Sequence, residues 1–338
     1  MRGLVLGVVA TGAALSIVVL VASTLRGESD ERELEAALDA LVEAGMPGAL
    51  VRVRNGDETL ELARGEARAG VRFRVGSVTK TFVAALTLML ADRGVIGLDD
   101  RVDAHLPGLL RDGDRITIRD LLRHRAGLFD YTSDPALLRD DLPPNAVVEI
   151  ADRRERMPGY AYSSTNYLAL GLVLEKATGA RIGELLRTHV FEPFALDDTT
   201  FQPGVVSGPH LHGHTLATRD GVATGAPRDT SESTAVSAWA AAAAVSTAAD
   251  LDRFFSHLRI RGYLARMAPL ASDRYGLGLG RGEATCGSGL GHTGNLLGTV
   301  TVVRMRGDRI AIVVGNAYPF TDEVGQRFAG LLREAICR

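Results

Sequence analysis

The chain has 338 residues, of which 46% are hydrophobic and 23% are charged, and its formal net charge is −3. This composition is typical of an ordered globular protein and excludes a largely disordered one. The small negative charge provides no basic field for a nucleic acid, so we exclude that class of partner. A chain of this length forms one large domain or two intimate ones.

An uncharged apolar segment opens the chain, from Leu4 to Leu25, with Arg2 and Arg26 on either side. At about 1.5 Å per residue, a helix of this length can cross a bilayer. The segment is longer than the apolar core of a usual signal peptide and lacks a clear Ala-x-Ala site. We expect residues 1–26 to be a membrane anchor, with a cleaved signal peptide as the alternative. Either one places residues 27–338 outside the cytoplasm, anchored to the cell membrane or secreted.

The elements that follow begin with a helix capped by Ser29. In the segment 48–65, apolar and polar residues alternate on both sides of Asn55-Gly56, and this pattern predicts a β-hairpin. A helix over about residues 77–93 is hydrophobic on all sides and is therefore expected in the core. Residues 95–227 predict mainly short helices and loops, with helix starts at Thr117 and Asn166.

The last third of the chain predicts a buried helical region over residues 239–258 and then strands over 275–282, 296–305 and 309–316. A closing helix is expected from Thr321 to Cys337. Strands at both ends of the domain and helices between them predict an α+β fold, in which an antiparallel sheet flanked by helices stands beside a helical subdomain. The expected sheet subdomain is about 27–94 and 228–338, and the helical subdomain is about 95–227.

Lysine is scarce in this chain: Lys80 and Lys176 are the only two. Unlike a guanidinium, a desolvated ammonium can lose its proton and act as a base. Ser77 lies three residues before Lys80, a spacing that puts both side chains on one face of a helix. The pair therefore predicts a serine nucleophile beside its base. The alternative is an N-cap serine followed by a solvated lysine.

Two further segments accompany this pair, Tyr162-Ser163-Ser164 and His292-Thr293-Gly294. Together with Ser77-Val78-Thr79-Lys80, and in this order, they resemble the three motifs of the penicillin-recognising serine enzymes. Similar segments extend the resemblance over nearly all of residues 30–338 and favour the serine D-alanyl-D-alanine carboxypeptidases related to class C β-lactamases. The resemblance implies the serine β-lactamase and penicillin-binding protein fold, with the active site in the cleft between the two subdomains.

The resemblance also implies a role for each motif. Ser77 attacks a carbonyl and forms an acyl-enzyme, with Lys80 and Tyr162 as proton carriers, and either of these two is a candidate for the base. The backbone N–H groups of Ser77 and Asn295 form an oxyanion hole. Thr293 holds the terminal carboxylate of the substrate, helped by His292 when it is protonated. The residues implied in substrate binding are Ser164, Arg281, His292, Thr293, Gly294 and Asn295.

Three positions depart from the resembled pattern. Ser164 stands where the second motif has an asparagine, so a hydroxyl replaces the amide that binds the lysine and the substrate. Gly280 stands where carboxypeptidase relatives have an arginine for the carboxylate. Arg281 follows it, but strand alternation points Arg281 to the other face unless a bulge intervenes. Asn295 replaces a hydroxyl residue.

The chain has two cysteines, Cys286 and Cys337. The predicted export permits a disulfide between them, and the residues alone leave two free thiols as the alternative. The resemblance favours the disulfide, because the carboxypeptidase branch has one cysteine just before the third motif and another in the last helix.

Three histidines, His210, His212 and His214, alternate along the chain. On a strand they would share one face and could bind zinc. No cysteine or second carboxylate cluster accompanies them, so we expect a surface loop there, no metal and no cofactor.

The sequence therefore predicts a D-alanyl-D-alanine carboxypeptidase that acts on peptidoglycan stem peptides and binds β-lactams. We expect a monomer that contacts the membrane through residues 4–25 if these are not cleaved. One alternative is an esterase or β-lactamase with the same chemistry. Another is a catalytically silent penicillin-binding or sensor module. Ser164 and Gly280 favour these alternatives slightly, whereas the intact set of Ser77, Lys80 and Tyr162 favours an enzyme.

Overall fold

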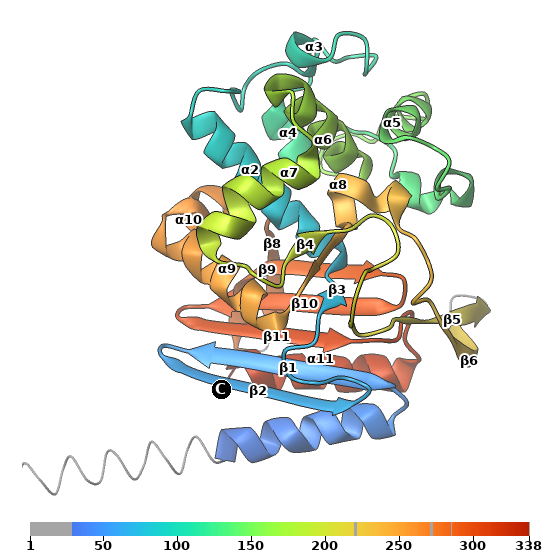
Figure 1. The fold of residues 1–338 in the computed structure, drawn as a ribbon, viewed down its shortest axis with the longest axis vertical. Helices are drawn as coiled ribbons and strands as arrows, with labels where there is room; N and C mark the ends of the chain where they lie inside the picture. The colour runs from blue at the N-terminus through green and yellow to red at the C-terminus, as the bar shows by residue number, and fades with distance from the viewer. Residues whose placement is uncertain (1–28, 220–221, 271–272, 285, 338) are drawn as a thin grey trace, which may run out of the picture.

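The computed structural model of the chain describes residues 29–219, 222–270, 273–284 and 286–337 (Figure 1). The apolar segment from Leu4 to Leu25 lies outside these ranges. Within them, no helix combines the length and the apolar character that crossing a bilayer requires.

One six-stranded antiparallel sheet occupies the lower half of the view in Figure 1. Across the sheet, the strands are β2 (Glu58–Gly65), β1 (Gly48–Asn55), β11 (Arg309–Gly315), β10 (Thr299–Arg306), β9 (Gly287–Leu296) and β8 (Gly280–Ala284). β1 and β2 form the predicted hairpin, in which Asn55 pairs with Glu58 across the turn. β1 also pairs with β11, so the two ends of the domain complete one sheet, as predicted.

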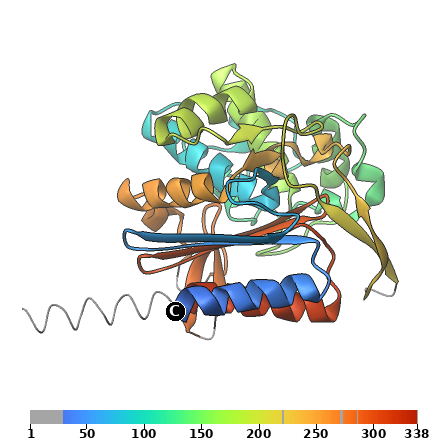
Figure 2. The ribbon, with the colours of Figure 1, turned by 60° about the horizontal axis from the view of Figure 1, so that its bottom comes forward.

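Two helices cover one face of this sheet. They span residues 29–43 and α11 (Asp322–Cys337), and they lie side by side beneath the sheet in Figure 2. A core cluster between these helices and the strands includes Leu34, Leu38, Leu41, Val51, Val53, Val302, Phe328 and Leu331. The predicted disulfide is confirmed: Cys286 and Cys337 are bonded, with their Cα atoms 5.5 Å apart. It ties the end of α11 to the start of β9.

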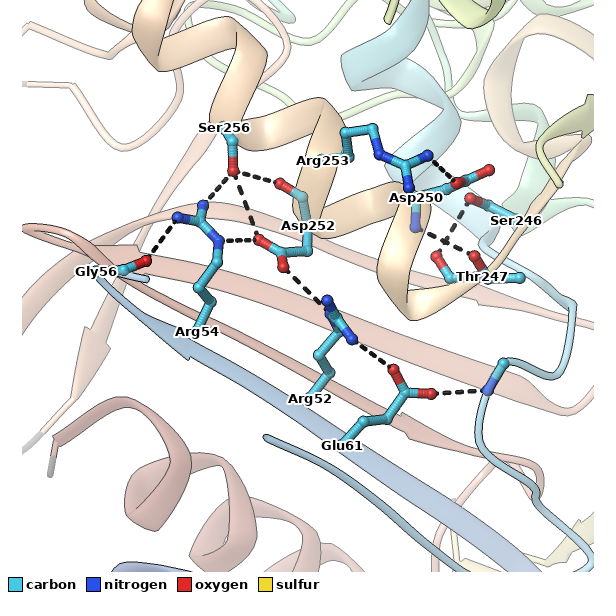
Figure 3. A network of polar contacts seen from close by, with 11 residues as sticks. Arg52, Arg54, Gly56, Glu61, Ser246, Thr247, Asp250, Asp252, Arg253 and Ser256 are labelled. Atoms are coloured by element: carbon cyan, nitrogen blue, oxygen red, sulfur yellow. Dashed lines mark hydrogen bonds and ion pairs between the residues drawn. The ribbon is translucent and has the colours of Figure 1, made fainter. Parts of the chain in front are cut away.

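α9 (Ala248–Ile260) packs on the opposite face of the sheet. Arg52 and Arg54 point from β1 to Asp252 of α9, with N–O distances of 3.2 and 2.6 Å (Figure 3). Arg52 also pairs at 2.8 Å with Glu61, which lies directly opposite it on β2. Because a buried carboxylate is stable only when it is paired, these contacts determine how α9 lies across the sheet.

The core of the molecule lies around α2 (Thr79–Asp92), in which every residue from Thr79 to Leu90 is buried. This confirms the predicted all-round apolar helix. Thr117 caps α4 through a capping box with Asp120, which confirms that predicted helix start. The other helices are α3 (Val102–His105), α4 (Ile118–Leu122), α5 (Pro144–Asp152), α6 (Thr165–Thr178), α7 (Ile182–Leu186), α8 (Trp239–Ala242) and α10 (Tyr263–Met267).

Short helical turns complete the helical part: η1 (Gly76–Val78), η2 (Tyr131–Ser133), η3 (Pro135–Leu137), η4 (Arg187–Phe191), η5 (Glu192–Phe194) and η6 (Val236–Ala238). η1 directly precedes α2. It is the turn that carries the predicted nucleophile.

The prediction of a continuous helical region over residues 239–258 is wrong in the middle of that region. There the chain forms β7 (Ala244–Ser246), which pairs with β3 (Phe73–Arg74) and β4 (Thr200–Phe201). The alanine run that precedes it carries no period, so only these long-range pairings reveal the strand. β5 (His214–Arg219) and β6 (Val222–Asp229) form a further hairpin within a region predicted as helices and loops.

Candidate active site

The three predicted motifs meet in one cleft of about 980 Å³ between the sheet and the helices. Ser77 comes from η1, Tyr162 and Ser164 from the segment before α6, and residues 292–295 from β9. Segments far apart in the sequence therefore form one site.

Ser77 and Lys80 lie as their spacing predicts. Lys80 Nζ is 2.9 Å from Ser77 Oγ, 3.3 Å from Ser164 Oγ and 3.0 Å from the carbonyl oxygen of Ala241. These three acceptors account for all three N–H bonds of an ammonium. Ala241, in α8, is a partner that the sequence did not reveal.

Lys80 is fully buried, with an exposed fraction of 0%. Burial lowers the pKa of Lys80 to about 7, while the negative charge of Asp130 opposes this shift. Burial has this effect because a charged amine is poorly solvated in the interior. At neutral pH a large fraction of Lys80 is therefore a neutral amine with a free lone pair, beside the Ser77 hydroxyl.

Tyr162 also lies beside Ser77 and forms a hydrogen bond with it. The residue is 37% exposed, but its ring lies against His124 at 4.2 Å between centroids and 5.2 Å from Lys80 Nζ. Burial raises the pKa of Tyr162, and the bond to Ser77 opposes that rise. Tyr162 is therefore a protonated phenol at neutral pH, which leaves Lys80 as the group suited to take a proton from Ser77.

Two glycines bring the backbone of Ser77 against β9. A Cβ on Gly76 would lie 2.6 Å from the nitrogen of Asn295, and one on Gly294 would lie 2.8 Å from the nitrogen of Ser77. Gly76 also has a φ of +54°, which other residues rarely adopt. This close approach places the N–H groups of Ser77 and Asn295 together, as an oxyanion hole requires.

His292 was expected to help Thr293 when it is protonated, and its surroundings favour the neutral form. It is buried, and burial together with the charge of Lys80 lowers the pKa of His292 to about 3. Its Nε2 lies 2.8 Å from the Tyr275 hydroxyl and its Nδ1 lies 2.7 Å from the carbonyl oxygen of Thr293. This pattern assigns the proton to Nδ1. His292 is therefore neutral and provides no charge for a carboxylate.

Arg304 of β10, which no motif had indicated, supplies the positive charge beside Thr293. Its Nη2 donates to Thr293 Oγ1 at 3.1 Å, and its side chain lines the cleft. Among the described residues, no carboxylate forms an ion pair with it. Arg281 also borders the cleft, but it pairs with Leu290 in a continuous register and so lies on the opposite face of the sheet from Thr293.

A glycine-only strip of the sheet makes room for the Arg304 side chain. Arg304 lies opposite Gly291 of β9, and on the same face Gly289 pairs with Gly282 of β8. A Cβ on Gly282 would lie 2.3 Å from Arg304 Nε. A guanidinium therefore reaches the cleft from β10, across residues without side chains, although position 280 itself is a glycine.

Two further residues of the site lie inside a segment that carried the family resemblance. His124 is fully buried beneath Tyr162, with a φ of +54°, and its pKa is lowered well below its usual value by burial and by Lys80. Asp130 lines the cleft and accepts the N–H of Ser164 at 3.1 Å. The motifs had indicated neither of them.

The three alternating histidines lie apart from this cleft. His212 pairs with Asp229, and His214 pairs with Glu66 at 2.8 Å. In the part of the chain that the structure describes, no group of three or more histidine, cysteine or carboxylate side chains is placed to hold a metal ion.

Comparison with known proteins identifies the class that this fold and site define. The family model described as Beta-lactamase matches residues 32–333, so the chain belongs to the β-lactamase family. It is a serine hydrolase of that family, which confirms the resemblance drawn from its motifs and the predicted fold.

Individual relatives agree with this assignment. The chain is 30% identical to a D-stereospecific amidohydrolase from Streptomyces sp., with a TM-score of 0.79, covering 88% of this chain and 97% of that one. It is 32% identical to penicillin-binding protein 4* of Bacillus subtilis (strain 168) over 38% of this chain and 30% of the relative. It is also 32% identical to penicillin-binding protein 4 of Amycolatopsis lactamdurans, over 52% of this chain and 50% of the relative. The matches thus span half or less of these two penicillin-binding proteins.

Proposed function

We propose that this chain hydrolyses an amide bond that precedes a D-amino acid with a free carboxylate, as a D-alanyl-D-alanine carboxypeptidase does. The observation that carries the proposal is the guanidinium of Arg304, which has no ion-pair partner among the described residues and lies 3.1 Å from Thr293 Oγ1 in the cleft that contains Ser77. A guanidinium binds a carboxylate through two parallel N–H bonds. A cationic group that lacks a counter-ion in a catalytic cleft favours an anionic substrate.

The same residues provide a complete route for the chemistry. Ser77 Oγ attacks the amide carbonyl carbon as its proton moves to Lys80 Nζ, and the carbonyl oxygen takes negative charge facing the N–H groups of Ser77 and Asn295. Tyr162 donates its proton to the leaving nitrogen and regains one from Lys80 as the C–N bond breaks. Water then hydrolyses the ester on Ser77, which releases the acid and restores the hydroxyl.

A second candidate is hydrolysis of D-amino acid amides, in which the leaving group carries no carboxylate. It is favoured by the similarity to the D-stereospecific amidohydrolase, which extends over nearly the whole of that protein. The nucleophile, base and oxyanion hole serve both reactions equally. The contribution of Arg304 to substrate binding therefore separates the two candidates.

The test compares D-alanyl-D-alanine with D-alanyl-D-alaninamide, whose carboxylate is blocked, by measuring release of free D-alanine. We expect Arg304→Gln to lower kcat/KM by about 10- to 100-fold for the free carboxylate and by less than about 3-fold for the amide, because only the former loses a charge-assisted hydrogen bond. Arg281→Gln is the control, because Arg281 also borders the cleft but lies on the opposite face of the sheet from Thr293. Equal losses on both substrates in Arg304→Gln, or a larger loss in Arg281→Gln, would contradict the proposal.

We also propose that the domain works outside the cytoplasm, held at the membrane by residues 4–25 or released from it. The support is the uncharged sequence of that segment. The disulfide between Cys286 and Cys337 is in keeping with an oxidising compartment.

A further inference from the structure

We propose that Oδ2 of Asp130 binds the free α-ammonium group of the acyl residue of the substrate. The preferred substrates are then D-aminoacyl compounds with an unblocked amino terminus, such as dipeptides. This inference rests on the proposed function and narrows its substrate class.

The surrounding backbone fixes the orientation of the Asp130 carboxylate. Its Oδ1 accepts the N–H of Thr132 at 3.3 Å and the N–H of Ser164 at 3.1 Å. Among the described residues, Oδ2 has no hydrogen-bond or ion-pair partner. Because Asp130 lines the cleft together with Ser77 and Tyr162, the catalytic cleft contains a carboxylate oxygen that is free to accept.

No described residue forms an ion pair with this carboxylate. The charges of Lys80 and Asp130 influence each other, but the N–H bonds of the Lys80 ammonium are directed to Ser77, Ser164 and Ala241. No described arginine or histidine forms an ion pair with Asp130. A partly buried carboxylate without a counter-ion is unfavourable, so a positively charged group on the substrate gains free energy by binding there.

The location of Asp130 specifies which part of the substrate carries that charge. Asp130 bonds to the N–H of Ser164, whose Oγ lies 3.3 Å from Lys80 Nζ, and that nitrogen lies 2.9 Å from Ser77 Oγ. Because Asp130 and Ser77 line the same cleft, with Ser164 and Lys80 between them, we assign the charge to a substituent on the acyl residue that Ser77 attacks. An α-ammonium is such a substituent.

Ser164 also disfavours a blocked amino terminus at this place. Its N–H is used by Asp130 and its hydroxyl accepts from Lys80. The backbone N–H of Ser164 is therefore not free to donate to the carbonyl oxygen of an N-acyl group. On this side the cleft offers an acceptor, which suits an ammonium, and on the side of β10 it offers Arg304, which suits a carboxylate. A dipeptide with both ends free carries both charges.

The test uses D-alanine 4-nitroanilide and its N-acetyl derivative, which differ only in the ammonium, with the purified full-length chain. We expect kcat/KM of the wild type to be at least about 10-fold higher for the free amine, because a hydrogen bond between charged groups has about that effect. Asp130→Asn keeps an oxygen for the two backbone N–H groups and turns an N–H toward the cleft. It should remove the preference by lowering kcat/KM for the free amine alone.

Asp99→Asn is the matched control, because Asp99 is an exposed carboxylate that pairs with Arg119 instead of lining the cleft. It should leave both rates unchanged. Equal kcat/KM for the two anilides in the wild type would overturn the inference. So would equal losses on both in Asp130→Asn, because Asp130 would then only hold the backbone of Thr132 and Ser164.

A binding measurement separates failure of this inference from failure of the proposed function. Calorimetry with D-alaninamide and a Ser77→Ala variant should give a Kd that rises at least about 10-fold when Asp130→Asn is added. If neither anilide is hydrolysed and D-alanyl-D-alanine releases no D-alanine, the proposed function fails, and this Kd still decides the role of Asp130. An unchanged Kd would overturn the ammonium site even if both anilides are cleaved.

Discussion

Lys80 explains why an arginine-rich chain places a lysine at its centre. A guanidinium at this position would remain charged, whereas burial lowers the pKa of the Lys80 ammonium to about 7. The neighbouring groups do not compete for the role of base: the pKa of His292 is lowered to about 3 and that of Tyr162 is raised. Lys80 is therefore the one group of this set that titrates near neutral pH.

The rate of acylation should follow the titration of Lys80. The active form is the neutral amine, so kcat/KM for an uncharged substrate such as 4-nitrophenyl acetate should rise with pH through about 7 and be constant above it. Activity is lost as the pH falls through that value, because Lys80 then holds a proton and cannot accept another. The measurement is a pH profile of kcat/KM between about pH 5 and pH 9.

Lys80→Arg is the control for this profile, because arginine stays protonated throughout the range. This variant should lower kcat/KM by about 10²- to 10⁴-fold, and its pH profile should lack the rise through about pH 7. A wild-type profile that is flat across this range, or a step that persists in Lys80→Arg, would show that another group is the base.

The pairing of β8, β9 and β10 builds the carboxylate side of the cleft. Arg304 crosses a strip made of Gly291, Gly289 and Gly282 before it reaches Thr293. A side chain on this strip obstructs either the arginine or the backbone, depending on the position. Single substitutions can therefore separate binding from folding.

Gly282→Ala should displace Arg304 with little effect on the fold. The new Cβ would lie 2.3 Å from Arg304 Nε. Because this atom belongs to a flexible side chain, the arginine can move away without a shift of the backbone. We expect an increase of about 10-fold in KM for D-alanyl-D-alanine and a thermal midpoint close to that of the wild type. Gly280→Ala, on the same face of β8, is the control, since its Cβ would meet nothing closer than 3.6 Å. Equal KM values in the two variants would contradict this role of the glycine strip.

The elements that the sequence predicted correctly are those with a local signal. The Asn55-Gly56 hairpin, the apolar helix α2 and the capping box at Thr117 depend on neighbouring residues, and the structure confirms all three. β7 was missed because its pairing with β3 and β4 is long-range. The same reason applies at the site: Ser77 and Lys80 are one helical turn apart, whereas Arg304 reaches Thr293 only through the register of β9 and β10.

At the scale of the whole molecule, both ends of the domain serve to position the site. β1 and β11 complete the sheet that contains β9, and the disulfide joins the start of β9 to α11. α2, on the face of the sheet opposite to α11, presents Lys80 to Ser77, while the segment before α6 brings Tyr162 from the helical side. Elements from distant parts of the described chain thus meet in one cleft, with Ser77, Tyr162 and Asn295 among its lining residues.

The most direct test of this arrangement is the intact mass of the purified chain after incubation with a penicillin, repeated with Ser77→Ala and Lys80→Arg. We expect the wild type to gain one penicillin or to consume the drug, and both variants to do neither, because acylation requires the serine oxygen and a neutral amine beside it. An adduct that persists in Ser77→Ala would contradict the assigned nucleophile. A wild type that gains no mass and leaves the penicillin intact would contradict the acyl-enzyme and the carboxypeptidase proposal with it.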